Sequence, residues 1–73
     1  MDNMQERIND AAYWVQLNRD TQTELRNEIV KLALQGKPVK ATAAKLRQAM
    51  LRHGELVRAQ NDLIRQQLAE AFG

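Results

Sequence analysis

A single interruption near the middle of the chain constrains the fold more than any other feature. Gly36, Lys37 and Pro38 separate two segments rich in Ala, Leu, Gln, Arg, Lys and Glu, the residues that favour helix. Glycine suits the left-handed residue that ends a helix, and a proline shortly after it prevents the helix from continuing. We therefore predict an all-α chain, with a turn near residues 36–39 that joins two arms of similar length.

Apolar residues recur along both arms at alternating steps of four and three, the spacing of a coiled-coil seam. If the arms fold back on each other, facing residues have numbers that sum to about 75, which places Gln22 opposite His53. The pattern predicts an antiparallel helical hairpin. Its predicted buried seam consists of Met4, Ile8, Val15, Leu25, Ile29, Leu46, Met50, Val57 and Ile64.

Two local signals leave a second architecture open, a compact bundle of three or four short helices. Thr21 is followed three residues later by Glu24, the pattern of a capping box at a helix start, and Asn18 could end a preceding helix. The segment around Gly54, residues 53–55, could also separate two helices, although glycine inside a helix costs only about 1 kcal/mol relative to alanine. In either architecture residues 1–73 form a single helical domain, because a chain this short cannot bury two cores.

The chain has more apolar surface than one hairpin can hide. It contains ten alanines, 22 larger apolar residues and no cysteine that could form a disulfide. A hairpin shields one seam, whereas two hairpins stacked as a four-helix bundle bury a wider stripe on every helix. We therefore expect a homo-oligomer, with a dimer favoured. The apolar residues that we expect at the interface are Tyr13, Trp14, Leu17, Leu34, Leu51, Leu56, Leu63 and Phe72.

No pattern in the sequence supports catalysis or a bound cofactor. With no cysteine and a single histidine, His53, the chain lacks a thiolate site and a His-rich metal site. Gly36 stands alone beside Lys37, which does not make a phosphate-binding loop. No apolar run approaches the roughly 18 residues of a membrane span. We expect a non-enzymatic, soluble, cytoplasmic protein with no metal, cofactor, membrane or small-molecule substrate.

Positive charge is concentrated after the turn. Residues 37–58 hold six basic side chains and one acidic, a net charge of +5, whereas residues 1–36 carry −2 and residues 59–73 carry −1. On a continuous helix the spacing of Lys40, Arg47 and Arg58 puts them on one face. Such a face could follow nucleic-acid phosphates, pair with the acidic first arm or meet an acidic protein. The candidate nucleic-acid-binding residues are Lys40, Lys45, Arg47, Arg52 and Arg58.

In outline, a hairpin of this size with Pro38 at its bend and a C-terminal helix ending in Phe72 resembles the needle subunits of type III secretion systems, or the small helical co-chaperones that hold them. Those needle subunits carry a paired-proline turn, whereas this chain has only one proline. In size and heptad pattern the chain is also similar to plasmid-encoded RNA-binding hairpin dimers. These resemblances concern architecture and imply no functional residue.

The sequence therefore leaves three functions open. The first is a self-associating interaction module that acts as a scaffold, an adaptor or a chaperone and meets a further protein partner. The second is a small nucleic-acid-binding regulator that uses the basic 37–58 segment. The third is the subunit of a helical filament, such as a secretion needle.

Overall fold

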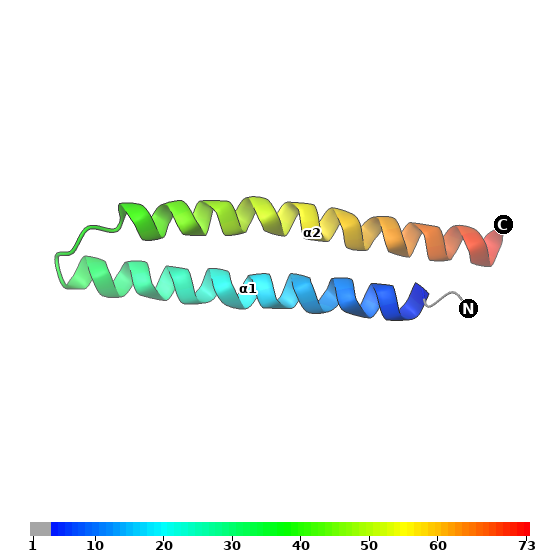
Figure 1. Cartoon of the computed structure of the whole chain (residues 1–73), viewed down its shortest axis with the longest axis horizontal. Helices are drawn as coiled ribbons and strands as arrows, with labels where there is room; N and C mark the ends of the chain where they lie inside the picture. Colours follow the sequence, from blue (N-terminus) through cyan, green and yellow to red (C-terminus); the bar gives the residue numbers. More distant parts are fainter. Residues whose placement is uncertain (1–3) are drawn as a thin grey trace.

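The computed structural model describes residues 4–73, which form an antiparallel hairpin of two long helices (Figure 1). Helix α1 spans Met4–Leu34 and helix α2 spans Lys40–Phe72. The helices lie side by side in a rod of 58 × 15 × 15 Å. The prediction of an all-α hairpin with a turn near residues 36–39 is confirmed.

Hydrogen bonds at the end of α1 explain the turn. Gly36 has a φ of +70°, the left-handed conformation that glycine adopts without a steric penalty. The Gly36 N–H donates to the Ala33 carbonyl (3.1 Å), and the Lys37 N–H donates to the Leu32 carbonyl (2.9 Å). These two bonds form a Schellman motif, which satisfies carbonyls that the helix would otherwise leave without a partner. Pro38 follows and prevents the chain from continuing the same helix.

Neither helix is interrupted at the positions where the sequence suggested a possible break, near Asn18 and Thr21 and near Gly54. Helix α1 is continuous from end to end, and α2 runs without interruption through Gly54. The hydroxyls of Thr21 and Thr23 donate to the carbonyls of Leu17 and Arg19, four residues earlier (3.0 and 3.1 Å). These threonines therefore bond within the helix instead of capping a new one. The chain does not adopt the compact bundle of three or four short helices.

The seam of α1 follows the predicted spacing along its whole length. Met4, Val15 and Gln22 are buried. The residues between and beyond them at the same spacing are half-buried: Ile8, Ala11, Asn18, Leu25, Ile29 and Leu32. The steps of four and three alternate without exception, so the predicted seam of α1 is confirmed.

The seam of α2 follows the prediction only in part. Met50 is 52% exposed and Ile64 is 37% exposed, so the prediction that both are buried is wrong. The expected Leu46, His53, Val57 and Gln60 are half-buried, and the other half-buried positions of the seam are Ala49, Leu56 and Leu63.

The physical reason is that apolar residues occupy two adjacent rows of α2. Leu56 precedes Val57 and Leu63 precedes Ile64, so the apolar stripe is wider than one neighbouring helix covers. Helix α1 covers the row of Leu56 and Leu63, leaves Val57 half-buried and leaves Ile64 exposed. Two residues that we expected at an outer interface, Leu56 and Leu63, therefore belong in part to the seam within the hairpin.

The C-terminal end of helix α2 also extends beyond the N-terminal end of α1. Every residue from Ile64 to Gly73 is exposed. Figure 1 shows the C-terminal end of α2 extending past the start of α1. The last turns of α2, including Leu68 and Phe72, therefore have little of α1 to pack against.

Candidate interaction surfaces

The hairpin has a thin interior. Among residues 4–73, the only buried apolar side chains are those of Met4 and Val15, and no large side chain is completely buried. Ten large apolar residues are exposed: Tyr13, Trp14, Leu17, Val30, Leu34, Met50, Leu51, Ile64, Leu68 and Phe72. Packing of α1 on α2 thus leaves these ten side chains exposed and, apart from Met4 and Val15, the other large apolar side chains of residues 4–73 are half-buried.

The accessible surface area of the hairpin is correspondingly large, 5882 Å². Compact monomers of this mass expose about 4,600 Å² by the usual scaling with mass. The excess of about 1,300 Å² is larger than the roughly 800 Å² that each partner contributes to a standard protein–protein interface. The elongated rod of two helices thus exposes more surface than a compact chain of the same mass.

Polar interactions do not hold the two helices together. Every side-chain hydrogen bond among the described residues joins two positions of the same helix. Buried Gln22 follows this rule: its Nε2 donates to Asn18 Oδ1 (2.7 Å), and Arg26 Nη2 donates to its Oε1 (3.3 Å). On α2, the Nδ1 atom of His53 is buried without a hydrogen-bond partner. The association of α1 with α2 therefore depends on apolar packing and on the turn.

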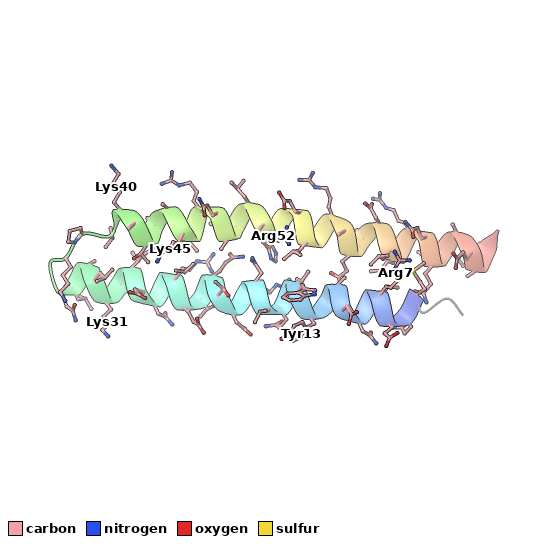
Figure 2. The ribbon with its side chains drawn as sticks, viewed as in Figure 1. Arg7, Tyr13, Lys31, Lys40, Lys45 and Arg52 are labelled. Carbon is pink, nitrogen blue, oxygen red and sulfur yellow. The ribbon has the colours of Figure 1, made fainter. Side chains whose placement is uncertain are left out.

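One face of the hairpin carries an open groove between the helices. Its lining consists of Trp14, Leu17, Asn18, Thr21, Arg52 and Leu56, around a volume of about 220 Å³. The Trp14 ring meets the ring of Tyr13 edge to face, with centroids 5.4 Å apart. The groove brings together three of the expected interface residues, Trp14, Leu17 and Leu56. Tyr13 does not line the groove, because it lies on the edge of α1 that faces away from α2 (Figure 2).

The remaining expected interface residues are scattered. Leu34 is exposed at the end of α1, Leu51 is exposed on α2, and Phe72 is exposed at the end of α2. Sequence reasoning missed a more continuous surface, because it assigned Met50 and Ile64 to the buried seam. The signal that could have revealed it is the pairing of adjacent apolar residues on α2, such as Leu63 with Ile64.

The basic residues of α2 divide between two sides. Lys40 points away from α1, and Lys45 and Arg52 lie toward it (Figure 2). Helical spacing puts Arg47 and Arg58 on the same outer side as Lys40. These five residues therefore do not form one continuous patch.

The acidic first arm does not neutralise this basic charge. Within residues 4–73 the only ion pair joins Arg52 to Glu55 on α2 itself (3.2 Å), and both side chains are 65% exposed. No carboxylate of α1 pairs with a basic residue of α2 in the described part of the chain. Lys40, Arg47 and Arg58 consequently present their charge to solvent or to a partner.

The described residues offer no metal centre and no membrane span. No three acidic or histidine side chains among residues 4–73 are placed to hold a metal ion. Neither α1 nor α2 combines the length and the apolar composition needed to cross a bilayer. No protein-family model, no curated protein and no solved structure matches the chain. Inferences about function therefore rest on the surfaces described above.

Proposed function

We propose that the chain is a non-enzymatic protein-interaction module that works as a homodimer of helical hairpins, in the manner of a scaffold, adaptor or chaperone. The observation that carries this proposal is the thin interior, with two buried apolar side chains against ten large exposed ones. A chain of this size without disulfides gains most of its stability from buried apolar surface. Stacking two hairpins as a four-helix bundle supplies that burial.

The way the hairpin is held together supports the same proposal. Because no side-chain hydrogen bond joins α1 to α2, the hairpin depends on a narrow apolar seam for its stability. Contiguous apolar surface on a soluble chain marks an interaction site. Covering that surface with a second copy adds stability by mass action, so folding and association become coupled.

The molar mass in solution tests the proposal. We expect sedimentation equilibrium to give twice the chain mass of 8.4 kDa at high concentration. The series should run from about 1 µM to 1 mM, which covers association free energies of roughly 4 to 8 kcal/mol. A mass that remains that of one chain throughout would refute the proposal. A mass that grows without limit would replace the dimer with a helical filament.

A second candidate function, nucleic-acid binding, is favoured by the unpaired basic charge on the outer side of α2. Lys40, Arg47 and Arg58 have no acidic partner among residues 4–73. Fluorescence anisotropy with mixed-sequence DNA and RNA tests this function, because phosphate contacts weaken steeply between about 50 and 200 mM salt.

Two charge-reversal variants complete that test. Arg47→Glu/Arg58→Glu should abolish binding if the outer side of α2 contacts phosphates. The matched control, Arg7→Glu/Arg19→Glu, makes the same change in net charge on α1. Equal losses in both variants would indicate a nonspecific effect of net charge. Absence of binding by the wild-type chain at low salt would eliminate this function.

A further inference from the structure

A second apolar row runs along α2 beside the seam. Residues seven positions apart share a helix face, and this row consists of Ala43, Met50, Val57, Ile64 and Ala71. Helix α1 covers it only in part: Met50, Ile64 and Ala71 are exposed, and Ala43 and Val57 are half-buried. The row lies on the opposite side of the seam from Arg52 and the groove beside Trp14, since positions before and after a seam residue flank it on opposite sides. It is therefore a separate surface.

The order of side-chain sizes in this row is the same in both directions. Small alanines stand at its ends, larger Met50 and Ile64 stand inside them, and Val57 is at the centre. When a two-fold axis relates two antiparallel helices, facing residues have numbers with a constant sum, about 114 for an axis at Val57. That sum sets Met50 against Ile64 of the second copy and Val57 against itself. A row of this kind is complementary to its own image.

The face that contains this row is uncharged over most of its length. Between Met50 and Ala71, the residues on it at steps of four and three are Met50, Gly54, Val57, Asn61, Ile64, Leu68 and Ala71. None of them is charged, although 27% of the chain is. Across a two-fold axis a charge near the centre meets its own like charge, which is unfavourable. The absence of charge therefore suits a second copy of this chain, and it does not suit a nucleic acid or an acidic protein.

Gly54 provides an independent observation. It lies on the same face, four residues after Met50 and three before Val57. A methyl group placed on its Cα would meet no atom within 4 Å, so nothing inside the hairpin requires glycine there. Glycine in a helix interior costs about 1 kcal/mol relative to alanine. Close approach of another backbone is a common reason for a glycine inside a helix, and Gly54 lies near the centre of the row.

We propose that α2 pairs with α2 of a second copy in the antiparallel direction, with a two-fold axis at Val57. This inference rests on the proposed homodimer and specifies its contact surface. The same patch serves both copies, as two-fold symmetry requires. The contact covers Met50, Ile64 and Leu68, three of the large apolar side chains that the hairpin leaves exposed.

Cysteine cross-linking tests the position of the axis, because the chain has no cysteine of its own. Under mild oxidation Val57→Cys should form a disulfide-linked dimer, since residues on the axis lie within disulfide distance of their own image. Met50→Cys alone should not cross-link, because its image lies opposite residue 64, about 21 Å away along the helix. Efficient cross-linking of Met50→Cys would indicate parallel helices and overturn the arrangement.

A charge placed in the row tests the contact itself. Ile64→Lys should raise the dimer dissociation constant at least about tenfold, because it buries an unpaired charge in the interface. The matched control is Val30→Lys, which changes an exposed apolar residue of α1 and should leave the constant unchanged. Circular dichroism establishes that each variant keeps its helices.

The results separate the two proposals. A wild-type dimer that tolerates Ile64→Lys and does not cross-link through Val57→Cys would overturn this contact and leave the homodimer standing. A wild-type chain that is monomeric at every concentration would overturn both. Cross-linking at residue 57 together with dissociation by Ile64→Lys is the result that we expect.

Discussion

The buried Gln22 in the seam should lower the free energy of unfolding of the hairpin. The substitution Gln22→Leu is therefore expected to stabilise it. Gln22 is 7% exposed and makes both of its hydrogen bonds within α1. A leucine buried in its place gains about 1.5–3 kcal/mol from the removal of apolar surface from water. The lost bonds are worth about 0.5–1.5 kcal/mol each, and this loss is reduced because Asn18 is half-buried and Arg26 exposed, so both can bond to water. The net gain should be about 1–2 kcal/mol.

Urea unfolding at one fixed protein concentration measures this gain. For a domain of this size the free energy of unfolding falls by about 1 kcal/mol per molar urea, so the midpoint should rise by about 1–2 M. Gln16→Leu is the matched control, because Gln16 makes the same type of bond to Asp20 (3.0 Å) on an exposed surface. Its effect should be below about 0.5 kcal/mol. An unchanged or lower midpoint for Gln22→Leu would refute the reasoning, because it would mean that the amide contributes a contact across the seam.

Three further predictions concern single positions. Gly36→Ala should lower the free energy of unfolding by about 1–2 kcal/mol in thermal melts, because the φ of +70° at this position is unfavourable for residues with a Cβ. Gly36→Asn should lower it less, and equal losses in the two variants would contradict this explanation. Gly54→Ala should stabilise the dilute hairpin by about 1 kcal/mol, since no atom obstructs the added methyl group; a lower melting temperature would show that the hairpin itself needs glycine there. Arg52→Ala should change urea stability by less than about 0.5 kcal/mol, because the pair with Glu55 is exposed, and a loss above 1 kcal/mol would contradict this.

The turn and the seam of α1 were predictable because each pattern has a single solution. Gly36 and Pro38 are the only closely spaced helix breakers in the chain, and they lead to one bend. On α1 the residues beside the seam are mostly polar, so only one face can be buried. The continuity of α1 near Thr21 was not predictable from local signals, since a threonine can cap a new helix or bond to the carbonyl four residues back. Packing along the whole of α2 favours the continuous helix.

The buried face of α2 could not be predicted from the sequence. Leu56 with Val57, and Leu63 with Ile64, place apolar side chains on two adjacent rows with the same seven-residue spacing. The seven-residue spacing is compatible with either row in the seam. Only the packing of α1 in three dimensions places Leu56 and Leu63 there. For the same reason the prediction put Met50 and Ile64 in the seam, although both are exposed, and put Leu56 and Leu63 at an outer interface, although both are half-buried.

The presence of two apolar rows on α2 also bears on how the protein assembles. A helix with one neighbour needs one apolar row, and a second row costs solubility without adding to its packing. A helix in a four-helix bundle packs against two adjacent helices, which contact two different faces of it. Such a helix therefore needs two apolar rows on adjacent faces. Helix α2 has both, and α1 has one long row plus the short patch at Trp14 and Leu17. The asymmetry between the helices therefore supports the proposed contact, in which α2 packs against α1 on one side and against a second α2 on the other.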